Sequence, residues 1–270
     1  MLNVLKDRIA SVFDPPPVVS VLRLNGAIGA AGFGKGLSDA GLAPMVERAF
    51  APKRLKAVAL SINSPGGSPT QSALIAARIR RLADEKDVPV IAFCEDVAAS
   101  GGYWLATAAD EIFADANSII GSIGVIYAGF GFHGFLAKQG VERRVHTAGQ
   151  SKSMLDPFQP EKAEDVERIK RLQGVIHDNF IEQVKSRRGD KLADQNLFTG
   201  EIWVGEQAKG VGLIDGVGHL APTMKARFGD KTTFRVMQPK RSLFQRLGGP
   251  GMAEIAGAVE ERALWARYGL

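Results

Sequence analysis

The chain has 270 residues and a mass of 28.9 kDa, which suits one sizeable α/β domain, with or without an appended arm. Hydrophobic residues make up 45% and glycines number 31, so we expect a folded chain with many tight turns, not a disordered one. The formal charge of +5 comes from 34 basic and 29 acidic residues that are largely interspersed, so no nucleic-acid partner is expected. Because Cys94 is the single cysteine, an intrachain disulfide is excluded.

The chain starts with an amphipathic stretch that a proline run ends. Residues 1–13 carry apolar side chains at helical spacing, and Asp14-Pro-Pro-Pro17 cannot continue a helix. Docking of this stretch on the body or on a sister subunit is favoured over contact with a membrane surface. No stretch reaches the ~18 apolar residues of a membrane span, and no signal peptide is seen, so we expect a cytoplasmic protein, with peripheral membrane contact as the alternative. We assign residues 1–17 to an N-terminal arm, 18–238 to the body and 239–270 to a C-terminal amphipathic arm.

Apolar runs that alternate with stretches of helical period predict a strand–helix–strand order in the body. Helices are predicted over residues 73–82 and from Pro160 to Gly189, where acidic residues open the helix and glycine stops it. Such alternation implies parallel strands joined by right-handed crossovers. The predicted strands are residues 18–24, 57–62, 88–94, 122–126 and 232–237.

Two segments place glycine or serine where a predicted strand meets a predicted helix. In Ser61-Ile-Asn-Ser-Pro-Gly-Gly67, the glycines allow main-chain N–H groups to approach a ligand at the positive end of the next helix, as an oxyanion requires. A plain strand-to-helix turn explains the same residues. In Ala98-Ala-Ser-Gly-Gly-Tyr-Trp104, Ser100 has small neighbours and precedes a helical stretch. That position suits a nucleophile, and it is also the usual position of a helix N-cap.

A serine nucleophile needs a base, and none of the four histidines lies in a motif that marks a catalytic histidine. The alternative is Lys152, in the polar loop of residues 147–157 that follows a strand-like run. A lysine accepts a proton only in its neutral form, which requires dry surroundings. We expect Met154, Leu155 and Phe158 to supply them, although a lone lysine in a loop is usually solvated.

Six short motifs follow one another along the chain. They are Asn63-Ser-Pro-Gly-Gly67, Ala99-Ser-Gly-Gly-Tyr103, Ile120-Gly-Ser-Ile-Gly-Val125, Gly149-Gln-Ser-Lys152, Thr199-Gly-Glu-Ile-Trp-Val-Gly-Glu-Gln-Ala208 and Gly212-Leu-Ile-Asp-Gly216. Taken in order, these motifs resemble the signal peptide peptidase A (protease IV) family, above all its short, single-unit SohB-type members. The resemblance extends over about residues 18–220.

The resemblance implies an α/β fold of the Clp protease/crotonase type, built of repeated ββα units. It implies a serine endopeptidase with a Ser/Lys dyad that uses no metal and no cofactor. Ser100 matches the family's nucleophile and Lys152 its general base. Ser122 matches the serine that holds the lysine amine in place.

The resemblance also implies how such an enzyme binds its substrate. Main-chain N–H groups of Gly101 and of either Gly66 or Gly67 form the oxyanion hole, and the choice within the glycine pair is left open. Hydrophobic peptides such as signal-peptide remnants are expected to bind along the edge formed by Pro65 to Ser68. Family members assemble into rings or domes, so a homo-oligomer is expected. Most also carry an N-terminal membrane anchor, which this sequence does not show.

Two other functions stay open on the sequence alone. A crotonase-type acyl-CoA enzyme would share the fold and use acidic residues for proton transfer, and Glu95 and Asp96 are the candidates. The other alternative is an inactive, membrane-associated scaffold of the same fold. The joint presence of Ser100, Lys152 and Ser122 argues against the scaffold.

Overall fold

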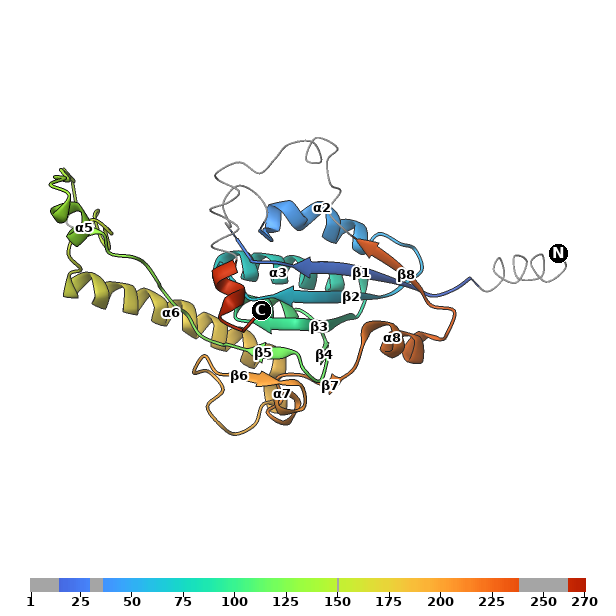
Figure 1. Cartoon of the computed structure of the whole chain (residues 1–270). Coiled ribbons are helices and arrows are strands. Elements are labelled where there is room, and N and C mark those ends of the chain that lie inside the picture. The colour runs from blue at the N-terminus through green and yellow to red at the C-terminus, as the bar shows by residue number, and fades with distance from the viewer. Residues whose placement is uncertain (1–14, 30–35, 150, 238–261) are drawn as a thin grey trace. The chain divides into compact units, whose positions relative to one another are not determined.

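The computed structural model describes residues 15–29, 36–149, 151–237 and 262–270 (Figure 1). Most of the two arms expected from the sequence, residues 1–14 and 238–261, lies outside the described residues. The chain divides into two compact units: a first unit of Met1–Ile123 with Glu182–Leu270, and a second unit of Gly124–Ile181. Each unit is described by itself below.

A mostly parallel sheet forms the centre of the first unit. The strand order is β6-β5-β3-β2-β1-β8, while β4 pairs with β3 and with β7. Among the described strand pairs only β5 and β6 run antiparallel, so the parallel α/β arrangement expected from the sequence is confirmed. The strands are β1 (Val18–Asn25), β2 (Leu55–Ser64), β3 (Val90–Ala99), β4 (Glu111–Ala114), β5 (Ile119–Gly121), β6 (Ile202–Val204), β7 (Gly216–Val217) and β8 (Thr233–Met237).

The helices follow the strands along the chain. In the first unit, α2 contacts β1 and α3, and α4 contacts β2, β3 and α3. Helix α6 starts in the second unit and ends in the first. The helices are α2 (Asp39–Ala49), α3 (Pro69–Lys86), α4 (Gly101–Ala106), α5 (His133–Lys138), α6 (Ala163–Arg188), α7 (Gly205–Gly210) and α8 (Leu220–Phe228), with a 3₁₀ turn at Gly189–Lys191.

Helix α3 begins directly after the Pro-Gly-Gly turn and fixes that turn in place. The Ser68 side chain accepts a hydrogen bond from the Gln71 N–H, and Pro69 occupies the first helical position, where its missing N–H costs nothing. Ile75 and Ile79 are fully buried one turn apart. The local sequence therefore sets the start of the helix, and its apolar stripe anchors it to the core.

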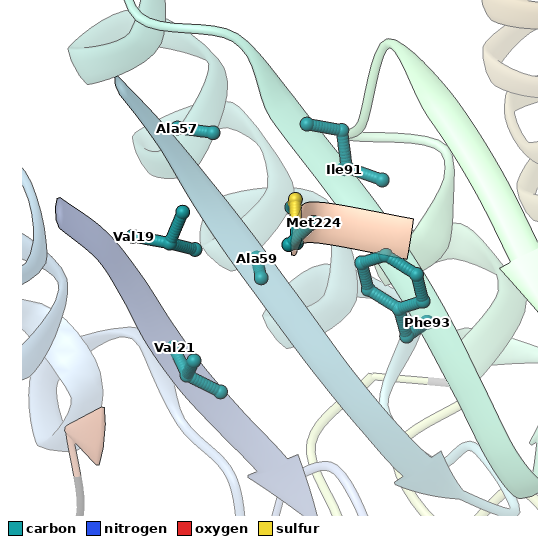
Figure 2. Close-up of a cluster of buried hydrophobic side chains, with 7 residues drawn as sticks. All are labelled: Val19, Val21, Ala57, Ala59, Ile91, Phe93 and Met224. Atoms are coloured by element: carbon teal, nitrogen blue, oxygen red, sulfur yellow. The ribbon is translucent and has the colours of Figure 1, made fainter. Parts of the chain in front are cut away.

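The core of the first unit has a layer on the α8 side of the sheet. Figure 2 shows its side chains, which come from the first three strands and from α8 and are at most 4% exposed: Val19, Val21, Ala57, Ala59, Ile91, Phe93 and Met224. Because side chains alternate along a strand, Leu22, Leu60 and Ala92 point to the opposite face and are also fully buried. Burial on both faces explains why these strands read as continuous apolar runs in the sequence.

The structure corrects two predicted strands. The strand expected over residues 122–126 is instead Ile119–Gly121, and Ser122 has a left-handed backbone with φ 51° that ends the strand. Residues 141–147, which precede the Lys152 loop, form no strand and are all exposed. Apolar β-branched residues occur in both stretches, but neither is paired with another strand over those residues, and side-chain preference alone does not make a strand.

In the second unit, Phe132 and Arg143 contact residues 156–158. The Phe132 N–H donates to the Pro157 carbonyl at 2.6 Å, and the rings of Phe132 and Phe158 lie 5.7 Å apart. The Arg143 guanidinium lies 4.8 Å from the centre of the Phe158 ring and pairs with Asp156 at 3.0 Å. Among the described residues from 124 to 164 none is buried. This part of the unit therefore has no hydrophobic core of its own.

A buried arginine ties the end of α6 to the first unit. The Arg188 side chain is 2% exposed, pairs with Asp215 at 2.8 Å and donates twice to the Gly212 carbonyl. Asp215 also accepts from Lys191 and from the Ile112 N–H, both at 2.7 Å. Burial alone would raise the pKa of Asp215, but the bonds from Arg188 and Lys191 outweigh it and hold the pKa below the ordinary value.

Replacing Arg188 with methionine is expected to lower the free energy of unfolding by about 3–5 kcal/mol at pH 7, because the Asp215 carboxylate is left buried without its main partner. Urea unfolding followed by circular dichroism measures the change. Arg81→Met is the control: Arg81 pairs with Glu85 at 2.7 Å, but both side chains are about half exposed, so a loss below about 1 kcal/mol is expected.

The contribution of the Arg188–Asp215 pair to the free energy of unfolding depends on pH, and the lowered pKa of Asp215 fixes its direction. Since the folded-state pKa of Asp215 is depressed, its stabilisation is present above the ordinary carboxyl pKa and is lost as the pH falls through the lowered value. The difference between wild type and Arg188→Met should therefore shrink in acid. A difference that is constant down to pH 2 would contradict this assignment.

Candidate active site

Ser100 lies at a sharp turn between β3 and α4. Its backbone has φ 53° and ψ −123°, a conformation that costs a non-glycine residue about 1–3 kcal/mol and persists only where the surroundings hold it. The Ser100 N–H donates to the Gly121 carbonyl at 2.8 Å, and the Ser100 carbonyl accepts from the Trp104 N–H at 3.0 Å. The side chain makes no capping hydrogen bond, which argues against the N-cap interpretation, and it is half-buried. The turn therefore presents a hydroxyl with no structural task in the helix.

The Pro-Gly-Gly turn at the end of β2 packs directly on Ser100. A Cβ atom on Gly66 would lie 2.7 Å from the Ser100 Cβ, and one on Gly67 would lie 2.0 Å from the Ile28 carbonyl oxygen. Both glycines also have positive φ, 99° and 143°. Glycine is therefore required twice, for conformation and for close approach.

The two glycines differ in what their N–H groups do. The Gly66 N–H donates to the Ser64 hydroxyl at 3.2 Å, and Gly66 is buried. Gly67 is exposed, and its nitrogen lies 3.4 Å from the position of a Cβ built on Gly101. In the part of the chain that the structure describes, neither the Gly67 nor the Gly101 N–H meets a backbone or side-chain acceptor. Two neighbouring main-chain donors are thus available beside Ser100.

Ser122 lies close to this turn through a second strained backbone. It has φ 51°, it is 7% exposed, and its N–H donates to the Glu201 carbonyl at 2.7 Å. The preceding residue, Gly121, holds the Ser100 N–H and packs under Trp203, whose ring a Cβ on Gly121 would approach to 2.7 Å. The structure therefore brings Ser100, Ser122 and the glycine turn together in the first unit.

The residues expected to bind substrate lie on the same edge. Pro65 is buried, and the Tyr268 hydroxyl oxygen lies 3.5 Å from its carbonyl oxygen and 3.4 Å from the Ser122 Oγ. Ser68 caps α3, and its N–H donates to the Ile28 carbonyl at 2.7 Å. Tyr268 was not anticipated from the sequence, because nothing in its neighbourhood marks a contact with residues more than 140 positions earlier.

Lys152 belongs to the second unit, whereas Ser100 and Ser122 belong to the first. Its side chain is exposed, and Met154 and Leu155 beside it are only half-buried. The expectation that neighbouring apolar residues keep this lysine dry is therefore wrong, because residues 151–155 form an open turn that leaves the amine in solvent.

The acidic residues considered for an acyl-CoA enzyme have other partners. Glu95 accepts from the Ser61 hydroxyl at 2.5 Å, and Asp96 accepts from the Asn63 amide at 2.6 Å. Both line a cavity of about 350 Å³ whose lining does not include Ser100. His219 pairs with Asp115 at 2.8 Å in the same cavity and lowers the pKa of that carboxyl to about 2, with help from Asn117. Glu95, Asp96 and His219 are therefore not candidates for proton transfer at the glycine turn.

A known protein family matches more than half of the chain. The sequence pattern of Peptidase family S49 matches residues 83–227, which is more than half of the chain and includes Ser100, Ser122 and Lys152. The chain belongs to peptidase family S49. No helix within the described residues is long and apolar enough to cross a membrane.

The chain is similar to proteins that carry different names. The chain is 52% identical over 271 residues to a Brucella melitensis protein named Na(+)/H(+) antiporter NhaA, covering 93% of this chain and 37% of that protein. It is 35% identical over 183 residues to Protease 4 of Haemophilus influenzae, covering 66% of this chain and 29% of that protein. The chain thus spans well under half of the length of each of these relatives.

The fold expected from the sequence is confirmed by solved structures. The membrane-bound stomatin-specific protease 1510-N, in complex with a substrate peptide, superposes with a TM-score of 0.53 at 15% identity. The match covers 89% of this chain and 98% of that one. At this identity the likeness concerns the Clp protease/crotonase-type fold alone.

Proposed function

We propose that this S49 chain is a serine endopeptidase that cleaves apolar peptides through an acyl-enzyme, with Ser100 as nucleophile and Lys152 as general base. The observation that carries the proposal is the Ser100 turn, where a hydroxyl that makes no capping hydrogen bond lies beside two main-chain N–H groups that meet no acceptor among the described residues. Membership of a peptidase family supports it. A crotonase-type reaction is less well supported, because Glu95 and Asp96 line a cavity whose lining does not include Ser100.

The oxyanion hole is assigned to the N–H groups of Gly67 and Gly101. Gly66 is left out because its N–H already bonds Ser64 and is buried. A tetrahedral oxyanion on a carbon attacked by Ser100 would accept from both donors at once. Each such donor is worth roughly 3 kcal/mol of transition-state stabilisation, and the position of Gly101 at the start of α4 adds a favourable dipole.

The base is assigned to Lys152, with Ser122 holding its amine. Support comes from the family pattern, which includes both residues, and from the strained, pinned backbone that fixes Ser122 beside the Ser100 turn. Because Lys152 is exposed, the exclusion of water that a neutral amine needs must come from another surface. We propose that the bound peptide or a second copy of the chain supplies it.

A homo-oligomer, in the form of a ring or dome, is part of the proposal. Among the described residues from 124 to 164 none is buried, yet this stretch contains large apolar side chains such as Phe130, which is 82% exposed, and Phe135, which is 62% exposed. A segment that exposes this much apolar surface needs a partner to cover it. A second copy of the chain would cover it and would enclose the Lys152 loop.

The reaction then proceeds in two halves. Lys152 takes the proton of Ser100 while the serine oxygen attacks the scissile carbonyl, and the oxyanion is held by the two glycine donors. The lysine returns the proton to the leaving amine, and the C–N bond breaks. Water then attacks the acyl-enzyme and gives its proton to Lys152, which passes that proton to the Ser100 oxygen as the acyl C–O bond breaks and the carboxylic acid product leaves.

The substrate is proposed to be an extended, hydrophobic peptide, such as a signal-peptide remnant, bound along Pro65 to Ser68. Main-chain groups at such an edge pair with any extended peptide, so sequence preference must come from side-chain pockets. The 1510-N protease was solved with a substrate peptide, which supports peptide binding by this fold. Action in the cytoplasm, or at a membrane surface reached through the two arms, stays a prediction.

Fluorophosphonate labelling tests the proposed function. The wild-type protein is incubated with the reagent, digested and mapped by mass spectrometry, and hydrolysis of a fluorogenic apolar peptide is followed in parallel. We expect one adduct, on Ser100, formed together with loss of hydrolysis, because an activated serine reacts and a hydratase has none. An adduct on another serine, or none at all, would refute the assignment.

A further inference from the structure

Strands β2 and β3 lie side by side in the sheet and lose their common register just before the Ser100 turn (Figure 1). The two strands pair residue by residue up to Ile62 and Cys94, and the next pair is Ser64 with Ala98. Between these pairs β2 has only Asn63, whereas β3 has residues 95–97, which form a bulge. Bulges are rare between parallel strands, and next to an active site they re-aim a side chain. The β3 bulge therefore lies where it can direct the turn that follows.

The side chain of Asn63 bridges the β3 bulge. Its Oδ1 accepts a hydrogen bond from the Val97 N–H at 3.2 Å, and its Nδ2 donates to the Asp96 Oδ2 at 2.6 Å. A main-chain N–H only donates and a carboxylate only accepts, so the bridge needs a side chain with both an acceptor and a donor, as an amide has. Val97 is fully buried, so water does not replace the Asn63 oxygen as the acceptor of its N–H.

The position of Ser100 depends on where the bulge leaves β3. Beyond the bulge, residues 97–99 pair with β5, and the Ser100 N–H donates to the Gly121 carbonyl at 2.8 Å. On the β2 side, a Cβ on Gly66 would lie only 2.7 Å from the Ser100 Cβ. Successive residues of a strand are about 3.3 Å apart, so a shift of β3 by a single residue would separate Ser100 from the Pro-Gly-Gly turn.

We propose that Asn63 is a positioning residue for peptide hydrolysis, because it holds the β3 bulge and thereby fixes Ser100 relative to the Gly67 N–H. The proposal rests on the proposed function, which assigns the nucleophile and this oxyanion donor. A displacement of about 1 Å at a reacting group lowers a rate on the order of 10²-fold.

The peptide-binding edge has other supports. The Ile28 N–H donates to the Gly66 carbonyl at 2.9 Å, and the Ser68 N–H donates to the Ile28 carbonyl at 2.7 Å. Neither bond involves the Asn63 side chain. Loss of that side chain should therefore change kcat far more than KM.

Steady-state kinetics of Asn63→Ala on the fluorogenic peptide give the first test. We expect kcat to fall on the order of 10²-fold and KM to stay within about threefold of the wild type. Fluorophosphonate labelling of Ser100 should slow by a factor similar to that for kcat.

Ser61→Ala is the matched control on the same strand. The Ser61 hydroxyl also bonds a carboxylate of the bulge, that of Glu95 at 2.5 Å, but it bonds a side chain where Asn63 bonds a main-chain N–H. Ser61 also pairs with Phe93, before the bulge begins. This variant should leave kcat and the labelling rate unchanged.

Exchange of the two polar side chains gives a rescue test. Asn63→Asp places two carboxylates in contact, and their repulsion should lower kcat at least as far as Asn63→Ala does. Adding Asp96→Asn to Asn63→Asp restores a complementary pair, because the carboxylate then accepts from the Val97 N–H and from the new amide. The kcat of this double variant should return to within about threefold of the wild type.

Hydrogen exchange gives a test that does not depend on catalysis. Asn63→Ala should speed amide exchange over residues 95–101 at least about tenfold, because the Val97 N–H loses its acceptor. Exchange over the same residues should be unchanged in Ser61→Ala. Mass spectrometry after digestion measures both.

The outcomes separate this proposal from the proposed function. Faster exchange in Asn63→Ala, in a protein whose wild type neither hydrolyses peptide nor reacts with fluorophosphonate, would refute the peptidase and keep Asn63 as the residue that holds the bulge. A kcat in Asn63→Ala within threefold of an active wild type would overturn the positioning role and keep the peptidase. Unchanged exchange in Asn63→Ala, an equal loss of kcat in Ser61→Ala, or a double variant that stays as slow as Asn63→Asp would also overturn it.

Discussion

Alanine at Ser100 is expected to lower kcat for peptide hydrolysis by a factor on the order of 10⁶, to the level left by binding and the oxyanion donors. The hydroxyl supplies the bond-forming oxygen, and no other side chain at the turn replaces it. The Ser100 side chain makes no capping hydrogen bond, so the free energy of unfolding should change by less than about 0.5 kcal/mol. Steady-state kinetics on a fluorogenic peptide and urea unfolding measure the two quantities.

A matched substitution on the surface separates chemistry from folding. Ser186→Ala on α6 removes an exposed serine hydroxyl that bonds only its own helix, and it should keep full activity. If Ser100→Ala hydrolyses peptide at more than a hundredth of the wild-type rate with the stability unchanged, Ser100 is not the nucleophile.

Removal of the Lys152 amine is expected to lower kcat for peptide hydrolysis by a factor similar to that for Ser100→Ala, because a nucleophile and its base act as one unit. Both Lys152→Ala and Lys152→Arg should be inactive, since arginine keeps the positive charge but cannot release its proton to act as a base. The side chain is exposed, so neither change should reduce stability.

The control for this experiment lies in the same unit. Lys162→Ala removes an exposed lysine just before α6 and should leave the rate unchanged. A rate of peptide hydrolysis in Lys152→Arg close to that of the wild type would rule out a lysine base.

Much of the Ser100 turn could be predicted from the sequence because its requirements are local. Small residues around Ser100 and two glycines after Pro65 are signs of close backbone approach, and the structure places them in contact. The choice of Gly67 over Gly66 could not be predicted, since it depends on which N–H the Ser64 hydroxyl accepts from.

Features that depend on contacts between residues far apart in the sequence were not predicted, or were predicted at the wrong residues. The strand expected over residues 122–126 ends before Ser122 because the backbone turns to meet the Glu201 carbonyl, which no local pattern reports. The Arg188–Asp215 pair joins residues 27 positions apart, and side-chain burial of this kind follows from the assembled fold. The dry setting expected for Lys152 failed for the same reason, since apolar neighbours in sequence do not enclose a side chain unless the chain folds over it.

The two strained serines are fixed in series by main-chain bonds, from the Glu201 carbonyl to Ser122 and from the Gly121 carbonyl to Ser100. Carbonyl oxygens are common to all residues, so the identity of the side chain at position 201 does not enter the placement of either hydroxyl. The number of residues in this stretch does affect the placement. One residue added or lost between Glu201 and Trp203 would shift the register of β6 on β5 and break the hydrogen bond from the Ser122 N–H to the Glu201 carbonyl. Tolerance of substitution together with intolerance of insertion is therefore built into β6, the strand at one end of the sheet.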